Sequence, residues 1–159
     1  MPHIHELYDF TTSAFILHPT QPELCLHYHK KLNKWLQPGG HIELDEDPIE
    51  ALAHELREET GLVLDDCEML LQPDRPTGRG LKSLPIPFNV FTHFFDDTHQ
   101  HIDLTYLVRA NTEELSPQEG ESQQIGWFTL QAVQDLHQQG QVFDNTLDIV
   151  QWIFSKNLT

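Results

Sequence analysis

The clearest periodic pattern of apolar residues predicts an amphipathic helix from about Pro48 to Thr60. Asp47 can cap its first turn, Pro48 suits the first helical position, and a glutamate follows the cap by three residues. Gly61 supplies the left-handed residue at which many helices end. The apolar residues that recur at the spacing of one buried face are Ile49, Leu52, Ala53 and Leu56.

Segments rich in β-branched and aromatic residues predict two pairs of strands. The first pair, Thr12–Leu17 and Leu24–His29, is joined by a turn that contains two prolines. The second pair, Phe88–Phe95 and Ile102–Arg109, is predicted to form a hairpin across the segment Asp-Asp-Thr-His-Gln.

The C-terminal part of the chain is predicted to form one more strand and two helices. A strand near Ile125–Phe128 leads into a helix at about Leu130–Gln138. A last amphipathic helix begins at Phe143-Asp144-Asn145, and the residues on its apolar face are Ile149, Trp152 and Ile153. The alternation of strands and helices, without a linker or repeat, predicts a single α/β domain over residues 1–159.

The chain carries a formal net charge of −16 at pH 7, and acidic residues are dense around the predicted Pro48–Thr60 helix. Such a charge opposes binding to nucleic acid or to an anionic membrane without a metal ion. The N-terminus, MPHIHELYDF, is polar, and no apolar run could span a bilayer, so neither a signal peptide nor a membrane span is expected. Two cysteines provide no disulfide framework, which favours a reduced, cytoplasmic setting.

Three carboxylates, Glu55, Glu58 and Glu59, crowd the last turns of the predicted helix. Each like-charge pair one turn apart costs about 0.2–0.5 kcal/mol, and the negative end of the helix dipole adds a penalty of similar size. His54 lies one turn from Glu58 as a compensating group. A bound divalent cation would make the cluster favourable, because hard oxygen ligands suit Mg²⁺ or Mn²⁺. A solvated acidic helix face is the alternative.

The run from Gly40 to Leu62, GHIELDEDPIEALAHELREETGL, resembles the signature of the Nudix hydrolases. That signature is a Gly, five residues, a Glu, seven residues, and then Arg-Glu-apolar-any-Glu-Glu-any-Gly-apolar. The resemblance implies the Nudix fold, an α/β/α sandwich around a mixed β-sheet. His54 departs from the signature, because it stands where the family usually has Arg. The residues that fall in register are Gly40, Glu46, Glu55, Leu56, Glu58, Glu59, Gly61 and Leu62.

The resemblance implies hydrolysis of a pyrophosphate bond in a nucleoside diphosphate linked to another group, with a metal-activated water as the nucleophile. Glu55, Glu58 and Glu59 would be the core ligands of Mg²⁺ or Mn²⁺, with Glu55 and Glu58 also catalytic. The peptide carbonyl of Gly39 would be a further ligand, because glycine lets the backbone approach the metal. The residues that would orient these ligands without touching the metal are Glu46 and Gly40.

A downstream loop is expected to supply one more carboxylate, because the family often has one before a strand that opens with Trp. In the stretch GESQQIGWFTL, Glu121 precedes Trp127 by six residues and is the expected extra ligand or general base. Glu119 is the second candidate, and an ordinary solvated loop acid is the alternative. His54 is expected to keep the structural part of the missing Arg, as a hydrogen-bond donor whose charge depends on pH. An exposed, uninvolved His54 is the alternative.

Two small cationic groups stand out in this acidic chain, one before Trp35 and one in the loop from Pro73 to Leu84. Arg79, Lys34 and Lys82 are the expected contacts to substrate phosphates. Solubility and loop charge are the alternative explanation. The members of the two groups are Lys30, Lys31, Lys34, Arg75, Arg79 and Lys82.

Histidines raise the alternative of a zinc site. His27 and His29 alternate on one predicted strand, and His101 and Asp103 alternate on another. Zinc sites generally need four converging ligands, and nothing in this pattern fixes such convergence. Polar positions on half-exposed strands are the preferred interpretation.

Three functional classes remain open: a metal-dependent pyrophosphohydrolase, a non-catalytic Nudix-like domain that binds a nucleotide derivative, and an isomerase of isoprenoid diphosphates. Intact box carboxylates favour the first. The isomerase ranks last, because Cys25 and Cys67 do not resemble its catalytic cysteine context. The sequence leaves open which small nucleoside diphosphate derivative is the substrate and whether the chain forms a homodimer. Trp35, Phe88 or Phe91 could stack on a substrate base or belong to the core.

Overall fold

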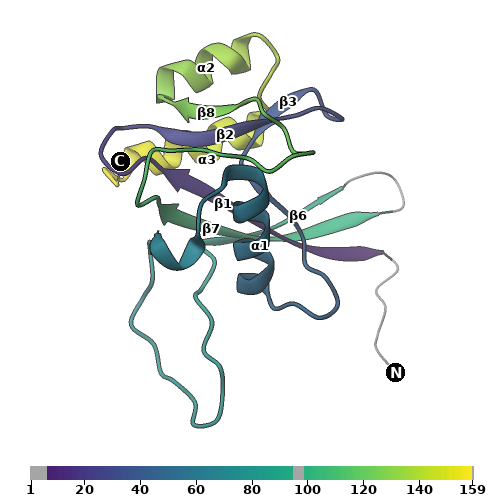
Figure 1. Ribbon diagram of the computed structural model, residues 1–159, viewed down its shortest axis with the longest axis vertical. Helices are drawn as coiled ribbons and strands as arrows, with labels where there is room; N and C mark the ends of the chain where they lie inside the picture. Colours follow the sequence, from purple (N-terminus) through teal and green to yellow (C-terminus); the bar gives the residue numbers. More distant parts are fainter. Residues whose placement is uncertain (1–6, 95–98, 159) are drawn as a thin grey trace.

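The computed structural model describes residues 7–94 and 99–158, and Figure 1 shows their arrangement. The strands are β1 (Tyr8–Leu17), β2 (Leu24–His29), β3 (Lys34–Leu36), β4 (Gly39–His41), β5 (Glu68–Met69), β6 (Asn89–Phe94), β7 (Gln100–Arg109) and β8 (Ile125–Phe128). The helices are α1 (Pro48–Thr60), the short 3₁₀ helix η1 (Leu64–Asp66), α2 (Leu130–Gln138) and α3 (Asp144–Ser155). No helix within the described ranges is long and apolar enough to cross a membrane.

The described strands join one mixed sheet, and the parallel pairing of β1 with β7 is its longest ladder. That pairing runs in unbroken register along all ten residues of both strands. The other edge of β1 is shared, because Thr11–Ser13 pair with β4 whereas only Ile16 and Leu17 pair with β2. The short strand β4 is therefore fixed against the middle of the sheet.

Side chains of β1 alternate between two cores, one on each face of the sheet. Ala14 and Ile16 pack with Leu52 and Leu56 of α1. Complete burial of a leucine side chain contributes about 1.5–3 kcal/mol, so these contacts anchor α1 to the sheet. Figure 1 shows α1 crossing in front of the strands. The core residues of the opposite face, which α2 and α3 cover, include Phe15, Leu17, Leu107, Val133, Val150 and Ile153.

The α/β/α layering confirms the fold class expected from the sequence. The predicted limits of α1, β2, β8 and α2 agree with those observed, and β6 and β7 form the predicted antiparallel hairpin. Residues 95–98, at the predicted hairpin turn, lie outside the described residues. Three strands, β3, β4 and β5, were not predicted, because two or three residues cannot show a periodic pattern.

The apolar face predicted for the last helix is not uniformly buried. Ile153 is completely buried on α3, but Trp152 is 41% exposed. Its indole stacks on the ring of Phe88, with centroids 5.8 Å apart and an interplanar angle of 11°. Trp152 therefore lies at the border of the apolar face, where α3 meets the segment that leads into β6.

Candidate active site

Local contacts fix both ends of α1. At its start, Asp47 accepts hydrogen bonds from the N–H groups of Ile49 and Glu50 at 2.9 and 3.0 Å, and Glu50 accepts one from the N–H of Asp47 at 2.9 Å. At its end, Gly61 has a φ of 79°, and a Cβ there would lie 2.6 Å from the carbonyl oxygen of Ser116. These caps hold the last turns of α1, which carry the predicted metal ligands, in one position.

β4 brings the backbone of two glycines against the end of α1. The N–H of Gly39 donates to Oε2 of Glu59 at 2.8 Å. A Cβ on Gly40 would lie 2.0 Å from Oε1 of Glu55, so the absence of a side chain makes room for that carboxylate. Gly39 itself has a φ of 150°, and a Cβ there would lie 2.3 Å from the carbonyl oxygen of Thr12. The backbone therefore requires glycine at position 39, whereas glycine at position 40 makes room for the Glu55 carboxylate.

At this contact Glu59 is buried and Glu55 is half-buried, and removal from water disfavours the charged form of each carboxylate. Burial raises the pKa of Glu59 to about 8; the hydrogen bond from Gly39 opposes this rise, and the neighbouring charges of Glu55, Glu121 and Glu58 add to it. Burial also raises the pKa of Glu55, while His54 partly offsets the rise. A divalent cation would favour the ionised forms of both carboxylates. This buried set of oxygen donors fits Mg²⁺ or Mn²⁺.

The carboxylates would have to rotate to surround an ion. Within the described ranges, no group of three or more His, Cys, Asp or Glu side chains is arranged to hold a metal as it stands. Glu59 is turned toward the N–H of Gly39, and Glu58 is turned toward His54. The same finding gives no support to the zinc alternative at His27, His29, His101 and Asp103.

Each ring nitrogen of His54 contacts a glutamate carboxylate. Nε2 lies 3.1 Å from Oε1 of Glu58, one turn further along α1, and Nδ1 lies 3.2 Å from Oε1 of Glu46. The hydrogen bond to Glu58 is the main cause that raises the pKa of His54 above its usual value. The geometry suits the structural role expected for His54, but its partners are Glu58 and Glu46 rather than Glu55. His54 therefore joins the loop before α1 to a predicted metal ligand.

The loop that carries Glu121 is tied to the C-terminal end of α1. The N–H of Ser116 donates to the carbonyl of Thr60, and the N–H of Gln118 donates to the carbonyl of Glu58, both at 2.8 Å. These bonds satisfy carbonyl groups that a helix end leaves unpaired. They also place the loop beside the buried carboxylates.

Electrostatics distinguish the two acids of this loop. Glu121 is half-buried, and its charge contributes to the raised pKa values of both Glu55 and Glu59. Glu119 is exposed and is not among the groups that raise either pKa. Its exposure and these charge effects therefore favour Glu121 over Glu119 as the additional carboxylate.

Sequence reasoning missed a buried histidine beside the same glutamates. His27 on β2 is 4% exposed, and its Nδ1 lies 3.6 Å from Oε1 of Glu59. That nitrogen forms no hydrogen bond with any part of the chain that the structure describes. Burial, with a smaller effect from His29, lowers the pKa of His27 to about 4. The predicted half-exposed position is wrong for His27, because its side chain faces the α1 side of β2; its alternation with the core residue Cys25 was the available signal.

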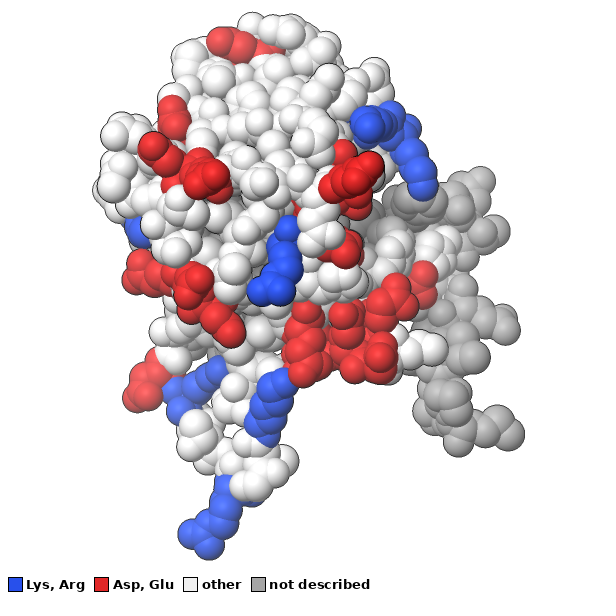
Figure 2. Space-filling view, viewed as in Figure 1, with Lys and Arg blue, Asp and Glu red and all other residues white. Residues whose placement is uncertain are grey.

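Lys82 and Arg79, two of the cations predicted to bind substrate phosphates, lie in the long connection between β5 and β6. The Nζ of Lys82 donates to Asp47 and lies 3.1 Å from Oε1 of Glu50, so it tethers this connection to the start of α1. Arg79 is exposed, on a segment that extends away from the sheet in Figure 1. Figure 2 shows acidic side chains gathered over α1 and the loop before it, and basic ones on the extended segment. A phosphate-binding role for both cations stays a prediction.

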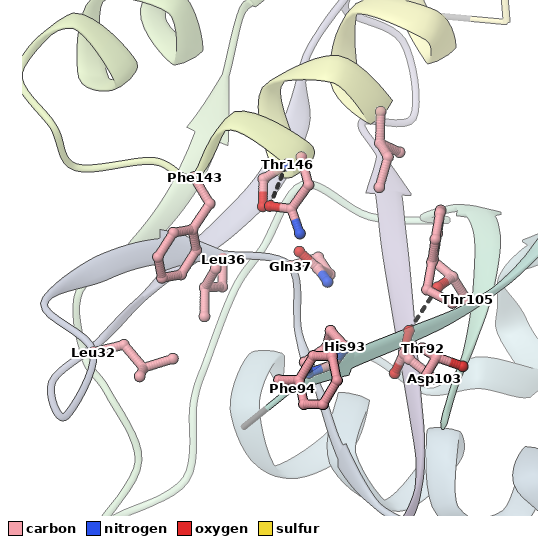
Figure 3. A pocket seen from close by; sticks show the side chains of 13 residues that line it. Leu32, Leu36, Gln37, Thr92, His93, Phe94, Asp103, Thr105, Phe143 and Thr146 are labelled. Carbon is pink, nitrogen blue, oxygen red and sulfur yellow. Dashed lines mark hydrogen bonds between the residues drawn. The ribbon is translucent and has the colours of Figure 1, made fainter. Parts of the chain in front are cut away.

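A pocket of about 670 Å³ lies between β6, β7 and the start of α3 (Figure 3). Its lining residues on β7, Asp103 and Thr105, alternate with Leu104, which belongs to the α1 core, so the pocket opens on the opposite face of the sheet. Lys34, the third predicted phosphate contact, has its Nζ 5.4 Å from the ring centre of Phe143 at the pocket wall and donates to a backbone carbonyl. The apolar lining includes Leu32, Leu36, Phe91, Phe94, Phe143 and Ile149.

Two polar residues of this pocket were not recognised as a site from the sequence. Asp103 is only 8% exposed, so its predicted half-exposed position is wrong. Gln37 has a buried Oε1 without a hydrogen-bond partner among the described residues. Gln37 stands two residues before Gly39, so the pocket and the glutamates meet at one turn of the chain. Of the aromatic residues considered for base stacking, Phe91 lines the pocket, whereas Trp35 packs in the core with its centroid 4.9 Å from that of Phe128.

Comparison with known proteins decides the family. A model of the NUDIX domain matches residues 9–148. The chain belongs to the Nudix family. A relative of this Nudix protein, the "Probable DHNTP pyrophosphohydrolase" of Lactococcus lactis subsp. cremoris (strain MG1363), is 33% identical over 117 residues, or 74% of this chain and 55% of the relative. The Nudix chain thus spans about half the length of that relative.

Solved structures share the Nudix fold with this chain. A NUDIX family hydrolase from Clostridium perfringens superposes with a TM-score of 0.75 and 29% identity, covering 92% of this chain and 96% of that one. A C. elegans Ap4A hydrolase in a binary complex gives a TM-score of 0.64 over 91% of this chain and 96% of that one, at 14% identity, and shows likeness of fold alone. The Nudix family expected from the sequence is confirmed.

Proposed function

We propose that this Nudix protein is a metal-dependent pyrophosphohydrolase that cleaves a pyrophosphate bond in a nucleoside diphosphate linked to another group. The observation that carries the proposal is the contact of half-buried Glu55 and buried Glu59 with the Gly39-Gly40 backbone. A purely structural site gains nothing from carboxylates whose burial disfavours their ionised form. When bound, Mg²⁺ or Mn²⁺ would neutralise substrate charge and lower the pKa of the attacking water.

The position of each residue suggests its part in the reaction. Glu121 approaches from the neighbouring loop, where it would act as a further ligand or accept the proton of the attacking water; Glu55 is the other candidate for that proton. His54 and Glu46 would keep Glu58 oriented. The groups that would hold the cation are the carboxylates of Glu55, Glu58 and Glu59 and the carbonyl of Gly39.

The organic part of the substrate would lie in the pocket of about 670 Å³, a volume typical of small-molecule sites. Its phosphates would pass the Gly39-Gly40 turn to reach the glutamates on the other face of the sheet. The name of the Lactococcus relative widens the candidate substrates from nucleotides to DHNTP (dihydroneopterin triphosphate). Both kinds of substrate join a heterocycle to a chain of phosphates.

We further infer a cytoplasmic location, because both cysteines are free thiols, and a small-molecule substrate rather than nucleic acid or membrane, because the net charge is −16. A homodimer stays a prediction. The isomerase alternative is not favoured: burial raises the pKa of Cys25 and of Cys67, so neither thiol is activated as a nucleophile.

The test uses protein stripped of metal and a panel of nucleoside diphosphate derivatives with DHNTP, each assayed with and without Mg²⁺. Wild type is compared with Glu58→Gln and with Asp74→Asn, which removes an exposed carboxylate from the β5–β6 connection. We expect Mg²⁺-dependent release of a monophosphate by wild type and Asp74→Asn, and a loss of about two orders of magnitude or more in Glu58→Gln. If a compound binds wild type and Glu58→Gln equally and is never cleaved, the non-catalytic binding domain becomes the preferred interpretation and the hydrolase proposal is wrong.

A further inference from the structure

The floor of the pocket opposite α1 is a carboxylate held in a fixed orientation. Asp103 accepts hydrogen bonds from the hydroxyls of Thr11 at 2.8 Å, and of Ser13 and Thr105 at 2.6 Å. An ionised carboxylate offers about four lone-pair positions, so three hydroxyl donors leave roughly one acceptor position. Because Asp103 also lines the cavity, that position is available to a ligand that donates a hydrogen.

Gln37 adds a second polar group with unused hydrogen-bonding capacity. Its Oε1 is buried and has no hydrogen-bond partner within the described residues. Figure 3 shows the carboxamide of Gln37 directed into the cavity, between the start of α3 and β6. Buried acceptors are nearly always paired in folded proteins, and rotation of the carboxamide can present either its oxygen or its nitrogen to a ligand.

The remaining lining determines which part of a substrate can enter. The described lining holds one histidine, His93, but no Lys or Arg, so a phosphate group would meet the Asp103 carboxylate with little compensating positive charge. Much of the wall consists of aromatic and aliphatic side chains, including Phe94 and Phe143, which suit the faces of a flat ring. The other polar lining residues are Thr92, His93, Asn145 and Thr146. A planar heterocycle that donates hydrogen bonds from its edge satisfies both features.

We propose that this pocket binds a planar heterocycle that carries adjacent ring N–H and amino groups, and that Asp103 determines specificity by accepting a hydrogen of the amino group. The class is the 2-amino-4-oxopyrimidine ring that guanine and pterins share. Gln37 pairs with a further edge of the same ring. The inference deepens the proposed function, on which it rests for the phosphate end of the substrate, but it concerns binding and not hydrolysis.

The test measures binding by NMR titration of metal-free protein, so that no turnover is involved. The probes are guanosine monophosphate, inosine monophosphate (which lacks the 2-amino group) and 7,8-dihydroneopterin. We expect guanosine monophosphate or dihydroneopterin to bind about tenfold more tightly than inosine monophosphate, with shifts in the side-chain amide signals of Gln37. Asp103→Asn, which keeps the shape of the floor, should remove most of this preference and leave the affinity for inosine monophosphate nearly unchanged.

A second variant guards against disturbance of the hydroxyl network around Asp103. Gln37→Met lies outside that network and removes the carboxamide at similar volume, so it should weaken binding of all rings while the thermal midpoint of the protein stays constant. The ratio of the affinities for guanosine monophosphate and dihydroneopterin shows whether the pocket prefers a guanine or a pterin ring. Equal affinities for guanosine and inosine monophosphates in wild type, or an unchanged preference in Asp103→Asn, would overturn the proposal.

The outcomes separate this proposal from the proposed function. If wild type prefers guanosine over inosine monophosphate but cleaves no compound with Mg²⁺, the proposal for the pocket stands and the hydrolase proposal is wrong. Mg²⁺-dependent cleavage without discrimination between these two monophosphates would support the hydrolase and overturn the proposal for the pocket.

Discussion

Nδ1 of His27 lies 3.6 Å from Oε1 of Glu59, and both side chains are buried between β2 and α1. Burial raises the pKa of Glu59 to about 8 and lowers that of His27 to about 4. Both groups are therefore uncharged near pH 7 without a bound cation. In an ordinary ion pair the carboxyl group has the lower pKa, whereas here the histidine has the lower pKa.

This reversal predicts that metal-free protein loses stability as pH rises from about 6.5 to 8. The folded pKa of Glu59 is above its unfolded value, so the unfolded state is already ionised in this window while the folded state still holds the proton. We expect a loss of roughly 1–2 kcal/mol in the free energy of unfolding, measured by urea denaturation in EDTA. Glu59→Gln should show a flatter dependence, and Mg²⁺ at pH 8 should stabilise wild type more than this variant. Parallel pH profiles for the two proteins would contradict the explanation.

Gly40→Ala should impair cation binding while leaving the fold intact. The new Cβ would lie 2.0 Å from Oε1 of Glu55, the end of a side chain that can rotate away, so the carboxylate moves and the backbone does not. Mn²⁺ affinity, measured by calorimetry, should fall about tenfold or more. Gly39→Ala is the contrasting variant: its Cβ would lie 2.3 Å from the backbone oxygen of Thr12, so we expect a lower thermal midpoint as well. Normal Mn²⁺ binding by Gly40→Ala would show that Glu55 is not a ligand.

Replacement of His54 should weaken metal binding because the residue holds both Glu58 and Glu46. We expect His54→Ala to lower Mg²⁺ affinity about 10–100-fold and turnover with it, whereas His54→Arg retains both. The folded pKa of His54 is raised, so its charge is present at pH 6.5 and is lost as pH rises through that raised value. The advantage of His54→Arg over wild type should therefore grow toward pH 9. Unchanged affinity and turnover in His54→Ala would make His54 an uninvolved surface residue.

Glu121→Gln and Glu119→Gln test the additional carboxylate. The charge of Glu121 acts on Glu55 and Glu59, whereas Glu119 is exposed. We expect kcat to fall about 10²–10⁴-fold in Glu121→Gln, the range for loss of a general base, and to stay within a factor of two in Glu119→Gln. If both variants retain wild-type kcat, the proton acceptor is Glu55.

Features that depend on neighbours in the sequence were predictable. The limits of α1 follow from its cap, its Pro, its terminating Gly and its 3.6-residue period, and all of these lie within one short segment. The contact between His54 and Glu58 follows from their separation of one helical turn. Gly40 of β4 follows from the Nudix signature, although the strand itself did not.

Features that depend on distant partners were not predictable. His27 is buried because α1 packs over β2, and the Asp103 network joins residues 90 and 92 positions apart. The pocket likewise needs Gln37, β6, β7 and α3 to meet, and no local pattern encodes that meeting. A single sequence shows that His27 and Asp103 are polar, but only the packing of distant segments shows that they are buried.

The parallel register of β1 with β7 also sets an order of assembly. Thr11 and Asp103 are paired across 92 positions, so β1 has no long partner until most of the chain has left the ribosome. Contacts between such distant segments form late, because closing the intervening loop costs entropy before any strand pairing can offset it. Every box glutamate is synthesised before β7, and α1 must wait for the completed sheet on which it packs. The nascent chain therefore carries its acidic helix before the sheet that brings the Gly39–Gly40 turn and the Glu121 loop together around it.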